Sequence, residues 1–345
     1  MERPNVEPPT CSDAPIRQLW LSAYILPTLN AADELGLFPL LEQGPLALQE
    51  IAAKLSVTFR GAEAMVATLS AVGLLAPTQG KFQLTELSRN FLLPDKPFYW
   101  GHMLKFYTQI PITHEAMMKS LRQDEPSVVN DGKALTDGWG GADVPAEQAA
   151  LITRAMHSLS FSAAVGLARA IDLRGVKRLL DVAGGSGCCS IAMAQRHPET
   201  RFTVADLAPV CAVANEYIAR HGASGQVDTT TLDMFRGEWP SGYDAIFFCH
   251  ILHDWEGARR QHLLRRSFEA LPPGGRLFVY EMLLSDAQDG PLTAALFSMC
   301  MVHVTLGKQF TAGQLSAEIG DAGFRDVSVE HVYAGYSLLS ARKPG

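Results

Sequence analysis

The spacing of apolar residues changes along the chain, and the change predicts two domains. Between residues 14 and 43, apolar positions recur at helical spacing with a glycine break inside the run. Two short helices are then predicted at 48–56 and 59–75, followed by two brief strands about a glycine turn within 74–85. This order is typical of a winged helix, so residues 1–110 are expected to form a mainly α winged-helix-like domain.

Strand and helix patterns alternate in the remainder of the chain, residues 111–345. A long helix is expected at 146–171, ahead of the first strand. Two final strands, 324–332 and 336–343, are predicted to pair antiparallel at one edge of the sheet. The alternation predicts an α/β domain with a Rossmann-like sheet.

Residues 179–198 predict a buried strand, a glycine turn and a helix that begins at that turn. The apolar run before the turn is typical of a parallel strand buried on both faces. In the turn, Gly184, Gly185 and Gly187 let the backbone approach a ligand where a Cβ would collide. The segment therefore predicts a nucleotide-type cofactor site.

Asp206 ends the second strand, where a carboxylate can accept hydrogen bonds from both ribose hydroxyls, so an adenosyl-type ligand is predicted. Three further features favour an adenosyl ligand other than a dinucleotide. Asp181, in the first strand's end, would repel a pyrophosphate but suits an amino-bearing or positively charged ligand. The segment LDMF, 232–235, is placed to hydrogen-bond an adenine amino group and cover its ring. HILHDWEG, 250–257, puts two histidines and a tryptophan at the carboxyl end of the sheet, where open α/β folds carry their chemistry.

These motifs together resemble a known family, the class I S-adenosylmethionine-dependent methyltransferases. The closest resemblance is to the small-molecule O-methyltransferases of the plant caffeate type and their bacterial secondary-metabolism relatives. It covers nearly the whole chain and is carried, in the family's order, by DVAGGSG, ADLAPV, LDMF, HILHDW and LPPGGRLFVYEMLL. The resemblance implies a seven-stranded sheet, S-adenosylmethionine as cofactor, and an N-terminal dimerisation module that intertwines with a second copy and walls its active site.

The resemblance also implies roles for individual residues. His253 is expected to be the general base, and Glu281 the carboxylate that orients it. The residues expected to contact the cofactor are Ser160, Asp181, Gly184, Gly185, Gly187, Asp206, Leu207, Asp233, Met234 and Phe235. The residues expected to contact the substrate are Met156, Trp255, Met299 and His303, for which ordinary core packing is the alternative. The Gly-, Asp- and Pro-rich segment 123–146 is expected to form a loop over the substrate cleft.

Three positions depart from the family pattern. Ala183 replaces the first glycine of the loop, which we expect to be tolerated only with a negative φ. Cys249 stands where many relatives have a lysine or arginine beside the adenine. Gln309 stands where plant members carry a second glutamate flanking the base, and a neutral amide stabilises a histidine cation less.

Two neighbours of the expected base have simpler interpretations. Asp254 is expected to cap a helix that begins near it rather than to act as an acid. His250 is expected to have a structural or adenine-side role.

Composition and charge indicate which classes of partner the protein is expected to lack. The chain of 345 residues has a formal net charge of −7, and residues 1–110 lack the clustered cations of a phosphate-binding face, so no nucleic-acid partner is expected. No segment offers a membrane-length apolar run or a signal core. The six cysteines have no zinc-site spacing, so we expect no metal, reduced thiols and a cytoplasmic location.

The leading interpretation is an S-adenosylmethionine-dependent O-methyltransferase that acts on a phenolic or enolic secondary metabolite and forms a homodimer. The alternatives within the fold are an N- or C-methyltransferase or a non-methylating member. A cofactor-sensing winged-helix regulator and a nicotinamide oxidoreductase are disfavoured, the first by its charge distribution and the second by the lack of a dehydrogenase acid/base pair.

Overall fold

The computed structural model describes residues 9–110, 112–123, 125–127, 129–130, 133–134 and 144–345. The chain forms two compact units, Met1–Lys105 and Phe106–Gly345. Each unit builds its own apolar core.

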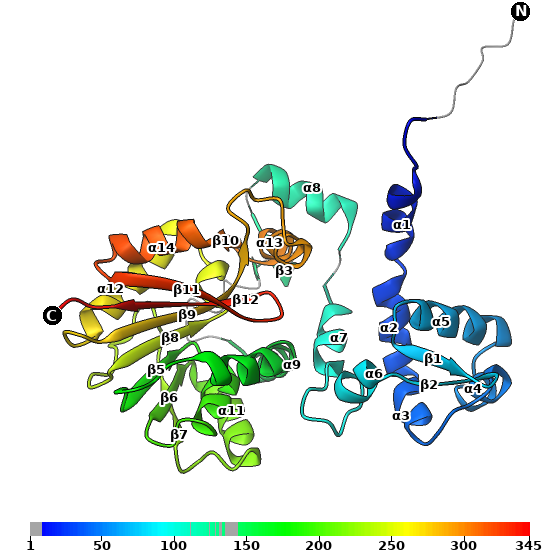
Figure 1. Ribbon diagram of the computed structural model, residues 1–345, viewed down its shortest axis with the longest axis horizontal. Helices are drawn as coiled ribbons and strands as arrows, with labels where there is room; N and C mark the ends of the chain where they lie inside the picture. The colour runs from blue at the N-terminus through cyan, green and yellow to red at the C-terminus, as the bar shows by residue number, and fades with distance from the viewer. Residues whose placement is uncertain (1–8, 111, 124, 128, 131–132, 135–143) are drawn as a thin grey trace, which may run out of the picture. The chain divides into compact units, whose positions relative to one another are not determined.

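The first unit is mainly helical and contains the helix, helix and hairpin order predicted for a winged helix (Figure 1). Its strands β1 (Leu75–Thr78) and β2 (Lys81–Leu84) pair antiparallel. They join through Gln79 (φ 48°) and Gly80 (φ 75°), the left-handed pair that suits the twist of a two-residue hairpin. The helices are α1 (Ala14–Ser22), α2 (Ile25–Glu34), α3 (Leu37–Glu42), α4 (Leu48–Lys54), α5 (Phe59–Ala71) and α6 (Glu86–Phe91), and α7 (Gly101–Tyr107) leads into the second unit.

The second unit is built on one sheet whose strands lie in the order β11-β12-β9-β8-β5-β6-β7. The five strands from β9 to β7 are parallel, whereas β12 and β11 complete the edge as an antiparallel pair, as predicted. The strands are β5 (Arg178–Val182), β6 (Arg201–Asp206), β7 (Val227–Thr231), β8 (Ala245–Cys249), β9 (Arg276–Leu284), β11 (Arg325–Tyr333) and β12 (Tyr336–Arg342). An eighth strand that was not expected, β10 (Phe310–Thr311), pairs in parallel with β9.

Helices cover both faces of this sheet, with α9 and α11 on one side and α12 and α14 on the other (Figure 1). The predicted long helix is present as α9 (Ala146–Ala170). The other helices are α8 (His114–Gln123), α10 (Cys188–Ala194), α11 (Ala208–Arg220), α12 (Gly257–Ala270), α13 (Leu292–Val304) and α14 (Ala312–Asp321). Most of segment 123–146 lies outside the described residues, so its predicted role as a loop over the substrate cleft stays a prediction. Its described part includes the short strands β3 (Val129–Asn130) and β4 (Lys133–Ala134).

The topology fixes where a ligand site belongs. Strand β5 has β6 on one side and β8 on the other, so the chain direction of the crossovers reverses at β5. In such sheets the crevice for a ligand opens beyond the carboxyl ends of the strands at this switch point. The glycine turn follows β5, and the HILHDW segment follows β8.

Candidate active site

The loop after β5 has the backbone of a ligand cradle. Gly185 (φ 58°) and Gly187 (φ 71°) both adopt the left-handed conformation that glycine tolerates without strain. A Cβ at Gly184 would lie 2.7 Å from the carboxyl carbon of Asp181, so this position requires glycine for space. The loop therefore depends on its glycines for both conformation and close approach.

The expectation that Ala183 keeps a negative φ is wrong. Its φ is 53°, a conformation that costs an L-residue roughly 1–2 kcal/mol. The backbone N–H of Ala183 donates to the carbonyl of Ala205 at 2.7 Å, a bond to the neighbouring strand that helps to hold this conformation.

Asp206 ties the loop to the end of β6. Its two carboxylate oxygens accept hydrogen bonds from the backbone N–H of Gly185 at 2.9 Å and of Leu207 at 2.7 Å. Burial raises the pKa of Asp206 to about 6, although these two N–H donors favour the charged form. The group is thus mainly a carboxylate at neutral pH, as ribose recognition requires.

Asp181 presents an unpartnered buried oxygen at the same loop. Its Oδ2 accepts a hydrogen bond from the hydroxyl of Ser190 at 2.6 Å, whereas Oδ1 is buried without a protein partner. Burial raises the pKa of Asp181 to about 7, Ser190 opposes this shift, and the nearby charge of Asp206 adds to it. A buried acceptor without a donor needs an explanation, and the ammonium group of an amino-acid ligand would supply one. The glycine cradle and this acceptor fit the methionine portion of S-adenosylmethionine.

The segment after β7 forms a turn suited to an adenine. The Oδ1 atom of Asp233 accepts hydrogen bonds from the N–H of Phe235 at 2.9 Å and of Arg236 at 3.1 Å. Met234 is buried, and the ring of Phe235 packs edge-on against Trp255 with centroids 4.7 Å apart. Trp255 is 2% exposed and packs on this ring, and its expected contact with the substrate stays a prediction.

His253 and Glu281 meet in the buried interior. His253 lies on a 3-10 turn (Leu252–Asp254) directly after β8, and Glu281 lies in the adjacent strand β9. The Nδ1 atom of His253 is 2.7 Å from Oε2 of Glu281, and their side chains are 3% and 0% exposed. The Nε2 atom of Gln309 is 3.1 Å from the same nitrogen. Both groups therefore lie at Nδ1, but an Nδ1–H that donates to Glu281 cannot also accept from the Gln309 amide, so only one of the two contacts is a hydrogen bond in a given tautomer. Nε2 is the nitrogen able to face a substrate.

A second carboxylate, missed in the sequence, lies beside Nε2. Oδ1 of Asp254 is 3.6 Å from this atom, and its side chain is 29% exposed. The expected capping role of Asp254 is wrong, because α12 begins at Gly257 with Glu256 at its N-cap. Burial alone lowers the pKa of His253, but Glu281 and Asp254 together outweigh it, so the pKa is raised above its ordinary value. An imidazole with a raised pKa is a stronger base.

The surroundings of His253 depend on two contacts that its local sequence does not reveal. The ring of Phe297 on α13 stands perpendicular to the imidazole, with centroids 5.3 Å apart. A Cβ at Gly307 would collide with the backbone carbonyl of His253. In the sequence, Phe297 is one apolar residue among several in its segment and Gly307 is a single glycine. Neither pattern indicates a contact with His253.

His250 lies among aromatic rings, and its expected structural or adenine-side role stays a prediction. Its φ is 57°, and its ring lies 5.0 Å from that of His253 and 5.0 Å from that of Tyr336. Burial lowers the pKa of His250 well below its ordinary range, and His253 adds to this effect, so the ring is neutral.

For the remaining predicted residues, the structure describes no contact with His253, Glu281 or Gln309. Met156 and Ser160 lie on α9, where Met156 is half-buried and Ser160 buried, and Met299 is half-buried on α13. The Nδ1 atom of His303 shares a hydrogen bond of 2.8 Å with the hydroxyl of Ser127. These four assignments stay predictions.

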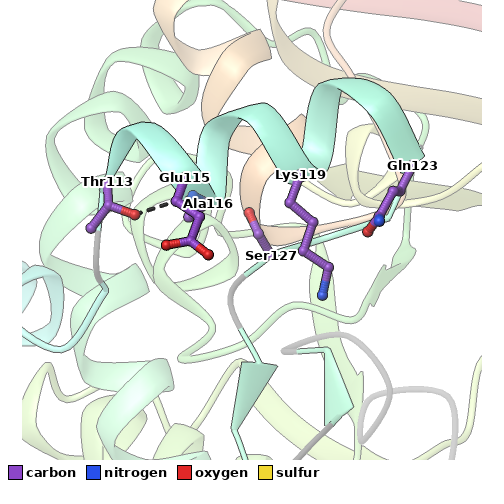
Figure 2. Close-up of a pocket in the computed structure, with 6 residues that line it drawn as sticks. All are labelled: Thr113, Glu115, Ala116, Lys119, Gln123 and Ser127. Atoms are coloured by element: carbon purple, nitrogen blue, oxygen red, sulfur yellow. Dashed lines mark hydrogen bonds between the residues drawn. The ribbon is translucent and has the colours of Figure 1, made fainter.

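A separate polar cavity of about 420 Å³ lies along α8 (Figure 2). It is lined by Thr113, Glu115, Ala116, Lys119, Gln123 and Ser127. None of the predicted cofactor residues lines it. In the described part of the chain, no group of three His, Cys, Asp or Glu side chains is arranged to hold a metal ion, and no helix is long and apolar enough to cross a membrane.

Comparison with known proteins identifies the family. Residues 137–325 match the O-methyltransferase domain, and residues 18–94 match the O-methyltransferase dimerisation domain. Among curated relatives, the 3-hydroxy-5-methyl-1-naphthoate 3-O-methyltransferase of Streptomyces sahachiroi is 33% identical over 310 residues, 87% of this chain and 86% of the relative. The L-tyrosine C(3)-methyltransferase of Streptomyces lavendulae is 31% identical over 280 residues, 79% of this chain and 75% of the relative.

A solved structure agrees with these matches. Human N-acetylserotonin methyltransferase, crystallised in complex with S-adenosylmethionine, aligns with a TM-score of 0.83 and 25% identity over 98% of this chain and 100% of that one. The chain therefore belongs to the O-methyltransferase family and is an S-adenosylmethionine-dependent methyltransferase with an N-terminal dimerisation domain.

Proposed function

We propose that the protein transfers a methyl group to the hydroxyl of a small aromatic or enolic secondary metabolite, with His253 as general base. The observation that carries this proposal is the buried contact of 2.7 Å between Nδ1 of His253 and the Glu281 carboxylate. The naphthoate O-methyltransferase relative makes a hydroxylated bicyclic aromatic acid the first acceptor class to test.

The bound cofactor supplies an electrophilic methyl group on its sulfonium. Glu281 holds the proton of His253 on Nδ1, so the lone pair of Nε2 is free to take the proton of an acceptor hydroxyl. A phenol with a pKa near 10 is a weak nucleophile at neutral pH, and a positioned base typically contributes about 10²- to 10⁴-fold. Glu281 then stabilises the imidazolium that forms.

Placement of the reactants is the larger contribution, since well-oriented groups reach effective molarities of roughly 10⁵ M or more. We assign cofactor placement to α9, to the end of β5 and the loop after it, to the end of β6, and to the turn after β7. The residues are Ser160, Asp181, Gly184, Gly185, Gly187, Asp206, Leu207, Asp233, Met234 and Phe235. Phe297, which packs against His253, is added to Met156, Trp255, Met299 and His303 as an acceptor contact.

We further propose a cytoplasmic homodimer whose dimerisation domain spans 1–110 and whose catalytic domain spans 111–345. The free cysteines support a reducing compartment. The exposed apolar residues of α1, together with the match to a dimerisation domain, support self-association.

The test is to incubate the protein with S-adenosylmethionine and hydroxynaphthoate acceptors and to measure a mass gain of one methyl on oxygen. His253→Gln should fold and bind S-adenosylhomocysteine normally, while turnover falls by about 10²-fold or more. Near-normal turnover of an oxygen nucleophile by this variant would refute the base.

Carbon methylation is the second candidate, because the tyrosine C-methyltransferase relative is also more than 30% identical. Nuclear magnetic resonance of the product separates carbon from oxygen and also detects a methyl group on nitrogen. An active enzyme in which His253→Ala has no effect would point to a nucleophile that needs no deprotonation.

A further inference from the structure

A buried histidine on α9 reaches the loop between β5 and α10. The Nδ1 atom of His157 and the hydroxyl of Ser186 share a hydrogen bond of 2.8 Å. Both residues are buried, at 6% and 3% exposure. Ser186 lies between Gly185 and Gly187. The hydrogen bond therefore connects the centre of the loop to α9, 29 residues earlier in the chain.

The ring of His157 is itself held in place by aromatic neighbours. It stacks on Tyr217 of α11, with centroids 3.8 Å apart and planes at 19°. Phe161, one turn further along α9, stacks with it at 4.8 Å and 25°. The imidazole is therefore fixed in orientation before any ligand binds.

The loop needs such an anchor. Ala183 has a φ of 53°, and a left-handed conformation at a residue other than glycine persists only where the surroundings hold it. On the sheet side, the loop is held by Ala205 and by the Asp206 carboxylate. Asp206 is also the group assigned to the cofactor ribose, whereas His157 is assigned no cofactor contact. The bond from His157 therefore holds the loop from α9, separately from the carboxylate assigned to the ribose.

We propose that His157 is a positioning residue that keeps the glycine loop in its cofactor-binding shape through Ser186. The proposal rests on the assignment of this loop as the cofactor site. Its effect falls on cofactor affinity alone, because His157 acts through the loop and does not take part in proton transfer at His253.

The test is a double-mutant cycle of His157→Phe and Ser186→Ala, read as the dissociation constant of S-adenosylhomocysteine by calorimetry. Phenylalanine keeps the stacked ring but removes the hydrogen bond. Each single variant should weaken binding roughly tenfold, the loss expected when a buried group is left unpaired, and the double variant should be no weaker than the singles. The KM for S-adenosylmethionine should rise, while kcat at saturation and the KM of the acceptor stay unchanged.

His157→Asn, which keeps a polar atom near the Nδ1 position, should recover part of the affinity. The matched control is His221→Phe, since His221 lies in the same aromatic group, 5.0 Å from Phe161, but its ring makes no hydrogen bond to the loop among the described residues.

Unchanged affinity in both single variants, or losses that add in the double variant, would overturn the proposal. Ser186→Ala leaves the stack intact and so keeps the test decisive if His157→Phe fails to fold. Full affinity in Asp206→Ala would instead refute the site assignment itself.

Discussion

At the scale of single residues, the chemistry depends on which nitrogen of His253 carries a proton. The Glu281 carboxylate is completely buried and, besides its contact with Nδ1 of His253, accepts no hydrogen bond from the described residues. A buried charge with one partner interacts strongly with that partner, because no water screens the pair. In the proposed mechanism we therefore expect Glu281 to set both the tautomer and the basicity of the imidazole.

This pairing predicts the pH dependence of turnover. Only neutral His253 accepts a proton, so kcat should rise through the raised pKa of His253 on the acid limb of its profile. Glu281→Gln removes the largest of the effects that raise this pKa, so the limb should move to lower pH while the maximal kcat falls roughly 10²-fold. Asp254→Asn is the matched control and should move the limb in the same direction by less. An unmoved acid limb in Glu281→Gln would contradict the assignment.

A second prediction at this scale concerns Asp181. Its pKa is raised to about 7, and an ammonium group binds the ionised form. Affinity for S-adenosylhomocysteine should therefore rise with pH and fall by up to about tenfold per unit below the pKa. Calorimetry between pH 5 and 8 on the wild type and on Asp181→Asn checks this. The variant should bind more weakly and lose the dependence between pH 6 and 8, whereas Asp206, with a pKa of about 6, still contributes below pH 6. An equally steep profile above pH 6 would exclude Asp181 as its source.

At the scale of elements, the turn after β8 packs against the segment between α13 and β10. Gln309 reaches His253 from just before β10, and the unexpected pairing of β10 with β9 places it there. Gly307 fits against the carbonyl of His253 with no room for a side chain. The proposed base is thus positioned by a segment that lies more than fifty residues further along the chain.

Gly307→Ala should test this packing. The added Cβ would push on the backbone of His253, and a displacement near 1 Å can cost about 10²-fold in rate. We expect kcat to fall by this order while S-adenosylhomocysteine affinity is preserved. Gly320→Ala is the control, since nothing lies within 4 Å of the new Cβ there and a helix gains up to about 1 kcal/mol from alanine. Full activity in Gly307→Ala would show that the turn adapts.

At the scale of the whole molecule, α1 exposes several large apolar side chains, and association of two copies of the chain would account for this exposure. Ile16, Leu19 and Trp20 are between 68% and 72% exposed, and α1 buries none of its residues within the chain. A helix that buries nothing in its own chain gains little from folding alone. A second copy would cover this face and stabilise the helix.

Leu19→Asp combined with Trp20→Asp should convert the dimer into a monomer in size-exclusion chromatography with light scattering, because two buried charges oppose association. Val329→Asp, which adds a charge to an exposed apolar residue of β11, should leave the dimer intact. A wild-type protein that elutes as a monomer would remove the proposed homodimer.

The local sequence alone determined much of this molecule. Apolar runs bounded by turns predicted the parallel strands and the glycine turn of a nucleotide-type cofactor site, because strand burial and glycine turns are properties of short segments. The order of the motifs resembled a known family, and that resemblance implied the seven-stranded sheet and S-adenosylmethionine. Local sequence misled us at Ala183, whose left-handed φ is held by a bond to Ala205, and at Asp254, where a 3-10 turn intervenes before α12.

The family resemblance already implied Glu281 and Gln309 beside His253. Only the tertiary structure decided that both lie at Nδ1 of that ring, that Phe297 packs against it, and that Ser186 meets His157 across 29 residues of chain. These contacts depend on how the strands register and how the helices pack on them. Such contacts decide proton affinity and loop shape, and no periodicity within one segment encodes them.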